Sequence, residues 1–364
     1  MKITDFQVYH YAIPLSCPLF VRGTALKQRE GFIVQLMNEK EVLGFGEAAP
    51  LIGFSKETKG EVFAQLKTLK SVIVGETIPT NAISLEGALT KWLKKFKLSS
   101  SVIFALESAV LYLMSNTKGV ALNNLLSNNS HEQIRINGLL QGKTKDLVIQ
   151  VKSMLKEGFN AFKLKVGTAA DLEEDIEKVQ AVSQEIEGKA ILHIDANQSW
   201  TLEQGIHFGK KVGLATIDYI EEPLRNILDI TEFFMETMLP VALDETIQTL
   251  NFDQIKSIEG VDVLILKPTC IGGVEKTWGL MELAKSAAIK TVISSSFESG
   301  IGLMTLAQLS GCSKRDNHAG LDTLKWLEYD LLKEHLCIEH GKLNIAARTC
   351  LAKDIDFSRL TKVL

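Results

Sequence analysis

From about residue 133 onward, short apolar runs alternate with amphipathic segments. Apolar runs of roughly four to eight residues between polar turns predict buried strands, and apolar residues three or four apart predict helices. The predicted strands are 134–138, 161–166, 190–195, 216–221, 241–244, 261–267 and 289–294. The predicted helices are 147–157, 171–186, 202–212, 230–238, 254–257 and 274–287. Strand–helix units of this length predict parallel strands joined by right-handed crossovers.

The first third of the chain has a different pattern. Residues 3–13 and 31–36 alternate as strands do, and 38–40 form the turn of an antiparallel hairpin that 44–47 closes. Apolar residues at helical spacing then predict helices over 57–74, 84–96 and 101–113.

These patterns predict an α/β protein with an N-terminal α+β capping domain and a barrel. We expect the capping domain over residues 1–125, the barrel over 126–325, and a segment 326–364 that packs back on the capping domain. A doubly wound sheet is the structural alternative. Gly272-Gly273 is not the GxGxxG turn that would favour it.

Composition narrows the function classes. A formal charge of −4 without long charged runs argues against nucleic acid and membrane surfaces as partners. No apolar run reaches the roughly 20 residues of a membrane span, and the first residues lack a signal-peptide core, so we expect a cytoplasmic protein. The five cysteines form no CxxC pair, which favours a reducing compartment.

Charged residues stand at the C-terminal ends of consecutive predicted strands. They are Lys163, Lys165, Asp195, Glu221, Glu222, Asp244, Glu245 and Lys267. In a parallel barrel these strand ends meet at one mouth, where active sites lie. One such residue would be an ordinary surface charge, but five consecutive strands that end this way favour a functional site.

The acids among them are suited to a metal ion. Asp195, Asp244 and one of Glu221 and Glu222 are oxygen donors from three neighbouring strands, without the His or Cys ligands of a zinc site. Such donors suit Mg²⁺, and Mn²⁺ binds the same ligands. Only one of the two adjacent glutamates can face the centre, and the pattern alone leaves that choice open.

The lysines indicate proton transfer. Lys163 and Lys165 lie on the same face of their strand. Burial and like charge both lower the pKa of a lysine, as a general base requires. A lysine base beside a divalent cation suits proton abstraction next to a carboxylate, because the cation stabilises the doubly charged enediolate that results.

These motifs resemble the muconate-lactonizing-enzyme branch of the enolase superfamily along nearly the whole chain. The matching motifs are Lys163-x-Lys165, Asp195-Ala196-Asn197, Glu221-Glu222-Pro223, Asp244-Glu245 and Lys267-Pro268. The resemblance implies a modified TIM barrel, (β/α)₇β, and makes Asp195, Glu221 and Asp244 the metal ligands. It implies that Asn197 and Glu245 support them, with Glu245 holding the ammonium group of Lys267.

Four further stretches resemble the o-succinylbenzoate synthases within that branch. They are 22–31, 50–58, 294–302 and 320–323. Dipeptide epimerases usually carry Asp-x-Asp near the last stretch to hold a substrate ammonium, and Gly320 replaces the first Asp here. The resemblance therefore implies Mg²⁺-dependent syn-dehydration of 2-succinyl-6-hydroxy-2,4-cyclohexadiene-1-carboxylate to 2-succinylbenzoate, a step of menaquinone biosynthesis.

The same resemblance assigns roles to the lysines. Lys165 would remove the ring proton and then protonate the departing hydroxyl, while Lys163 keeps the pKa of this base low. Lys267 would lie against the ring as a cation–π partner.

Substrate contacts are expected from the loops. Arg22 and Arg29 would lie on a loop that covers the ring. Ser294, Ser295, Ser296 and Gly320 would donate hydrogen bonds to the succinyl end.

Two other functions remain to be weighed. A dipeptide epimerase or N-acylamino acid racemase would use Lys165 and Lys267 as bases on opposite faces. A non-catalytic barrel that binds a metal or an acid would have no use for the lysines. The expected partner is a small carboxylate substrate, and no feature of the sequence specifies an oligomeric state.

Overall fold

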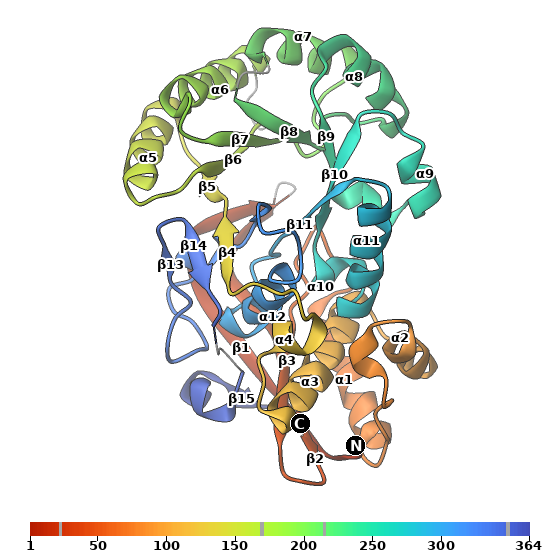
Figure 1. The fold of residues 1–364 in the computed structure, drawn as a ribbon. Helices are drawn as coiled ribbons and strands as arrows, with labels where there is room; N and C mark the ends of the chain where they lie inside the picture. The colour runs from red at the N-terminus through yellow and green to blue at the C-terminus, as the bar shows by residue number, and fades with distance from the viewer. Residues whose placement is uncertain (22–23, 168–170, 214–215, 347–349) are drawn as a thin grey trace.

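A curved parallel sheet, wrapped by helices, forms one half of the molecule (Figure 1). The computed structural model describes residues 1–21, 24–167, 171–213, 216–346 and 350–364. The strands of this sheet follow the chain order β5 Gly138–Leu140, β6 Ala161–Lys165, β7 Ile191–Asp195, β8 Ile217–Glu221, β9 Val241–Leu243, β10 Val261–Leu266 and β11 Lys290–Ile293. Every strand and helix predicted between 133 and 294 is present.

Two short strands complete the ring. β12 (His318–Ala319) pairs in parallel with β4 (Gln133–Ile136), and a bridge between Ser294 and Gly320 links the end of β11 to the end of β12. The predicted modified barrel is therefore confirmed. The helices outside it are α5 Thr144–Lys156, α6 Leu172–Ile186, α7 Leu202–Val212, α8 Ile230–Thr237, α9 Phe252–Lys256, α10 Pro268–Ile271, α11 Val274–Ser286 and α12 Gly300–Ser310.

An antiparallel sheet with helices on it forms the cap, as predicted. Its strands are β1 Ile3–Val21, β2 Thr24–Asn38 and β3 Leu43–Ala48, and its helices are α1 Lys59–Ile73, α2 Ala88–Leu93, α3 Ser100–Lys118 and α4 Leu122–Leu126. α3 lies directly on β3, because an added Cβ at Gly44 or Gly46 would come within 2.1 Å of a carbonyl oxygen of α3. α1 begins at a capping box, in which Thr58 and Glu61 bond each other's backbone N–H.

The end of the chain contacts both halves. β13 (Ile338–Glu339) and β14 (Lys342–Asn344) extend the sheet that contains β4, and β15 (Thr361–Lys362) pairs with β1. In the described parts of the chain, no helix is both long and apolar enough to span a bilayer.

Two predicted segments differ in the structure. Residues 24–29, expected in a loop, belong to β2, where Leu26 pairs with Leu19 of β1. Pro14 and Pro18 interrupt the alternation of β1, and the register shifts between Pro14 and Leu19, which hid this part of the hairpin from pattern reading. The helix expected over 84–96 is reduced to α2 between two 3₁₀ turns, because Gly87 adopts a left-handed conformation with φ of 90°.

Candidate active site

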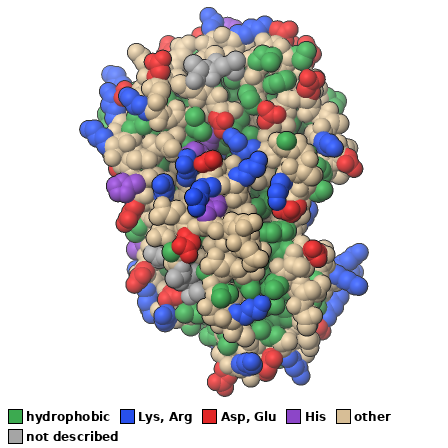
Figure 2. All heavy atoms as spheres, viewed as in Figure 1, with side chains coloured by type: hydrophobic (Ala, Val, Ile, Leu, Met, Phe, Trp, Pro, Cys, Tyr) green, Lys and Arg blue, Asp and Glu red, His purple; other side chains and the backbone are tan. Residues whose placement is uncertain are grey.

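The C-terminal ends of the barrel strands and two parts of the cap enclose a cavity of about 370 Å³. Its lining includes Lys163, Lys165, Asp195 and Lys267 from the barrel and Phe54 from the cap. Figure 2 shows basic and acidic side chains gathered between the two halves of the molecule. Four of the predicted strand-end residues therefore line the same cavity.

Lys163 bridges two of the predicted metal ligands. Its Nζ lies 3.0 Å from Asp195 Oδ2 and 2.6 Å from Glu221 Oε2. Parallel pairing sets Asp195 of β7 level with Glu221 of β8, so both carboxylates project at the same height in the barrel. Both acids are almost wholly shielded from solvent, and so an opposite charge is needed beside them.

A second lysine contacts the third predicted ligand. Lys267 donates a hydrogen bond to Asp244 Oδ2, and its Nζ lies 4.5 Å from the centre of the Phe54 ring. The carboxylate in direct contact is thus Asp244, while Glu245 acts on the same ammonium group through its charge. Burial and the charge of Asp244 raise the pKa of Glu245 to about 7, so Glu245 lies close enough to act through its charge.

The neighbouring glutamates point to different surroundings. Glu221 faces the cluster, while Glu222 accepts hydrogen bonds from the backbone N–H groups of Asp244 and Thr246, the Thr246 hydroxyl and the Gln198 amide. Glu222 is therefore fully engaged in positioning the end of β9. The structure answers the question that the pattern left open in favour of Glu221.

The charges of the cluster do not balance locally. Burial would lower the pKa of Lys163, but the charges of Asp195 and Glu221 outweigh it and raise that pKa. The expectation of a lowered pKa is therefore wrong for Lys163, which stays an ammonium. Burial, and after it the charge of Asp195, raise the pKa of Glu221 well above its usual range, although Lys163 and Lys267 oppose the shift.

The donor chemistry fits a hard divalent cation. Asp195, Glu221 and Asp244 offer only oxygen atoms, and Glu221 Oε1 is buried without a hydrogen-bond partner. In the described residues no three acidic, His or Cys side chains have the geometry of a metal site. The ammonium groups of Lys163 and Lys267 contact an oxygen of each of the three acids. The set fits Mg²⁺ by charge and atom type.

Lys165 differs from the other two lysines. Its backbone pairs with that of Asp195, it lines the cavity, and its side chain is exposed rather than buried in an ion pair. The expected desolvation of this residue is therefore wrong. Its position inside the cavity leaves it accessible to a bound molecule.

Arg29 has a role other than the predicted substrate contact. The residue is 3% exposed, and its guanidinium donates to the carbonyl oxygens of Glu30, Ala49, Pro50, Ser296 and Phe297. These bonds use its donors within the protein, so Arg29 ties the cap to the turn after β11. Arg22, the other predicted contact, lies outside the described residues.

The serine-rich turn only partly faces the cavity. Ser294, Ser295 and Gly320 line it, whereas the Ser296 hydroxyl lies 3.4 Å from the Cys270 sulfur. A side chain at residue 320 would collide with Ser294 Oγ, 2.5 Å from an added Cβ, which explains the glycine. Asn197 also lines the cavity, and its backbone N–H donates to Asp195 Oδ1 at 3.2 Å.

Pattern reading missed several lining residues. Phe54 is the aromatic residue of the 50–58 stretch, and this was its one signal. Lys178 reaches the cavity from the middle of α6, where a lysine looks like ordinary helix surface. Leu139 comes from β5, just past the predicted strand 134–138, and Asp322 follows β12 within the 320–323 stretch that the resemblance had singled out.

Known proteins resemble this chain in sequence and in fold. Residues 146–356 match the family of enolase C-terminal domain-like proteins, and residues 3–109 match the MenC N-terminal domain. The o-succinylbenzoate synthase of Haemophilus influenzae is 30% identical over 92% of this chain and 94% of its own.

Solved structures share the fold at lower identity. Muconate lactonizing enzyme from Pseudomonas fluorescens superposes with a TM-score of 0.87 at 20% identity, covering 98% of each chain. The L-Ala-D/L-Glu epimerase from Bacillus subtilis superposes with a TM-score of 0.85 at 18% identity, covering 100% of each chain.

Proposed function

The chain belongs to the o-succinylbenzoate synthase family of the enolase superfamily, and on this premise we propose that it dehydrates 2-succinyl-6-hydroxy-2,4-cyclohexadiene-1-carboxylate to 2-succinylbenzoate. Members of this family are hydro-lyases. The observation that carries the proposal is that Lys163, Lys165, Lys267 and Asp195 line one cavity at the barrel mouth. Glu221 and Asp244 lie directly behind this lining, paired with Lys163 and Lys267. In this assignment the enzyme takes part in menaquinone biosynthesis.

Asp195, Glu221 and Asp244 would hold Mg²⁺ or Mn²⁺. When bound, the ion neutralises the negative charge that builds up on the substrate carboxylate after proton loss. Asn197 supports this arrangement through its N–H bond to Asp195, and Glu245 through its charge. Glu222 keeps Asp244 in place through the backbone of that residue.

Lys165 would act first as base and then as acid. It removes the proton from the ring carbon beside the carboxylate, and the same ammonium then protonates the hydroxyl that leaves from the same face. Loss of water makes the ring aromatic, so the second step is downhill. The accessible position of Lys165 in the cavity supports this role.

The other lysines would stabilise charge. Lys163 remains an ammonium beside Asp195 and Glu221 and supplies positive potential at the reacting carboxylate. Lys267 would lie against the substrate ring. Its present contact with the Phe54 ring supports this, because it shows that an aromatic face fits beside the ammonium. Phe54 and Arg29 help to exclude water, the latter by fixing the surrounding turns.

A racemase or epimerase is the second candidate. The observation that favours it is that Lys165 and Lys267 come from β6 and from the end of β10, well separated around the barrel, as two opposed bases would. In D₂O, an epimerase would exchange the α-proton of an N-succinylamino acid or dipeptide. A dehydratase would instead form the aromatic product.

The direct test is to assay the purified protein with the cyclohexadiene substrate and follow the aromatic product by absorbance. We expect turnover with Mg²⁺ and none after EDTA, with recovery on readdition of the metal. Deuterium exchange into an N-succinylamino acid without any dehydration would contradict the proposal in favour of the second candidate.

A further inference from the structure

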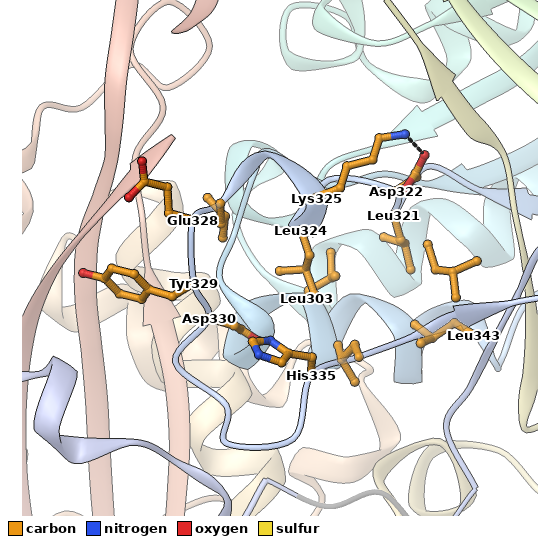
Figure 3. Close-up of a pocket in the computed structure, with 13 residues that line it drawn as sticks. Leu303, Leu321, Asp322, Leu324, Lys325, Glu328, Tyr329, Asp330, His335 and Leu343 are labelled. Atoms are coloured by element: carbon orange, nitrogen blue, oxygen red, sulfur yellow. Dashed lines mark hydrogen bonds and ion pairs between the residues drawn. The ribbon is translucent and has the colours of Figure 1, made fainter. Parts of the chain in front are cut away.

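Asp322 lies in the wall between two cavities. It lines the catalytic cavity together with Lys163, Lys165 and Lys267. It also lines a second cavity of about 330 Å³, which Leu303 and other apolar side chains border (Figure 3). The side chain is only 8% exposed, so its carboxylate is a nearly buried acid at the edge of the proposed active site.

The partner of this acid comes from the protein itself. Figure 3 shows Lys325 reaching toward Asp322, and its Nζ donates a hydrogen bond to Asp322 Oδ2. The same ammonium donates to Leu139 O at 3.1 Å, while Leu139 N–H donates to Asp322 Oδ2 at 2.9 Å. The two charged side chains therefore bond both backbone polar groups of Leu139 in β5.

Lys325 supplies its charge from outside the catalytic cavity. It lines the second cavity, it is 41% exposed, and its Nζ lies 4.7 Å from the centre of the Trp326 ring. The catalytic cavity thus contains an acid whose compensating cation is already in place. An acid buried to this extent requires such a cation, because an unpaired buried charge is costly.

We propose that Lys325 determines the substrate class of the catalytic cavity. Its ammonium group forms an ion pair with the Asp322 carboxylate, which is then not available to a substrate amine. The cavity therefore accepts carboxylate substrates without an amino group and disfavours substrates that carry a primary ammonium group. This rests on the proposed function, in which the substrate has two carboxylates and no amine. Lys325 is a positioning residue, since it acts through Asp322.

Removal of the Lys325 charge has a specific consequence. In Lys325→Gln the amide can still donate to Leu139 O, but Asp322 loses its cation. The Asp322 carboxylate can then bind a cation that enters the catalytic cavity. The ammonium group of an amine ligand can supply that cation. The negative charge of Asp322, which Lys325 neutralises in the wild type, then contributes to the binding of amines.

The test compares two probes on the Mg²⁺-loaded protein. L-Ala-L-Glu carries a primary ammonium, and N-acetyl-L-Ala-L-Glu does not. By calorimetry we expect Lys325→Gln and Lys325→Met to bind L-Ala-L-Glu about tenfold or more tightly than the wild type, with no gain for the acetylated probe. Exchange of the α-proton in D₂O, followed by NMR, should rise with binding.

Three controls separate charge from packing. Lys333→Gln alters another exposed lysine that bonds a backbone carbonyl, and Lys325→Arg keeps the charge, so neither should gain affinity for the amine. Lys325→Gln combined with Asp322→Asn should return to the wild-type affinity. Equal gains for both probes, or no gain in either neutral variant, would overturn the proposal.

The wild type provides a test that needs no variant. It should bind the acetylated probe more tightly than the free amine, and the opposite order would contradict the role of Lys325. The affinities are binding measurements and the α-proton exchange involves no loss of water, so all of these tests are independent of dehydration. Absence of dehydratase activity in the wild type would refute the proposed function alone.

Discussion

Buried acids occupy two regions of this molecule, and their partners differ. At the barrel mouth, Asp195 and Glu221 are held by the ammonium group of Lys163. Between barrel and cap, Glu47 accepts hydrogen bonds from Ser299 N–H at 2.9 Å, Ser299 Oγ–H at 2.6 Å and Gly302 N–H at 2.8 Å, at the start of α12.

Other acids between the two halves follow the same rule as Glu47. Asp330 accepts from Gly300 N–H at the start of α12, and Glu107 accepts from Glu275 N–H in the first turn of α11. The positive end of a helix dipole lies at each of these places. Glu47 and Glu107 thereby join the cap to the barrel through backbone donors, and Asp330 joins the C-terminal segment to the barrel in the same way.

The difference teaches which acids can change partners. A backbone N–H within a helix cannot leave its acceptor without unfolding the helix end, whereas a lysine side chain can rotate away. The acids at the mouth can therefore exchange an ammonium for another cation, and the acids between the halves cannot. We assign function to the first set and stability to the second.

We expect the largest effect on activity at Lys165, which contacts neither the acids at the barrel mouth nor the acids between the two halves. Lys165→Ala should lower kcat by about 10²–10⁴-fold or more, because no other side chain replaces the proposed base. The exposed Lys165 contributes little packing, so the melting temperature should hardly change. Lys256→Ala, an exposed lysine on α9, is the control. Activity within about tenfold of the wild type would remove Lys165 from the mechanism.

The second effect concerns the geometry of the mouth. Lys267→Arg keeps the charge but replaces a compact ammonium by a wide planar group beside Asp244 and Phe54. We expect kcat to fall by about 10²-fold, with Mg²⁺ still bound. Full activity in steady-state assays would show that charge alone suffices there, and that the ring contact is dispensable.

A substitution among the acids between barrel and cap should affect stability instead of activity. Glu47→Ala leaves the N–H groups of Ser299 and Gly302 buried without an acceptor, and we expect a loss of roughly 2–4 kcal/mol in the free energy of unfolding. Urea denaturation measures this, with the exposed Glu259→Ala as control. If the loss stays below about 0.5 kcal/mol, the contrast between the regions fails.

The last expected effect is a pH dependence of stability that requires no substitution. Burial raises the pKa of Glu107 to about 8, above the value of about 4.3 in an unfolded chain. The folded state thus retains a proton that the unfolded state releases. Stability should fall by up to about 1.4 kcal/mol per pH unit as pH rises from 4.3 to 8, and level off above.

Glu107→Gln has no such proton to lose. Denaturation midpoints of the wild type and Glu107→Gln, measured at several pH values, should therefore diverge progressively up to about pH 8 in favour of the variant. Curves that remain parallel would mean that Glu107 is ionised in the folded protein.

The sequence was sufficient for the barrel because its strands and helices are local and periodic. The strand ends placed Lys163, Asp195, Glu221, Asp244 and Lys267 at one mouth without knowledge of any contact. α12 was not anticipated, since the helix is buried on every side and so lacks an amphipathic pattern.

The pattern of apolar and polar residues could not predict side-chain contacts between segments that are distant in the sequence. In the sequence, Arg29 looks like an exposed arginine on a loop. Only the fold shows that its guanidinium donates hydrogen bonds to the carbonyl oxygens of Ser296 and Phe297. The choice of Asp244 over Glu245 as the partner of Lys267 depends in the same way on side-chain direction at the end of β9. Lys325 gave no signal, because its significance depends on Asp322 and Leu139 together.

The central claim is that the acids at the mouth exchange lysine for a divalent cation. Titration calorimetry of the protein with Mg²⁺ tests it most directly, with Glu221→Gln as the altered site and Glu107→Gln as a buried acid-to-amide control. We predict one Mg²⁺ per chain for the wild type and for Glu107→Gln, and a loss of affinity of about tenfold or more for Glu221→Gln. Equal affinity in all three proteins, or no binding in any, would contradict the claim.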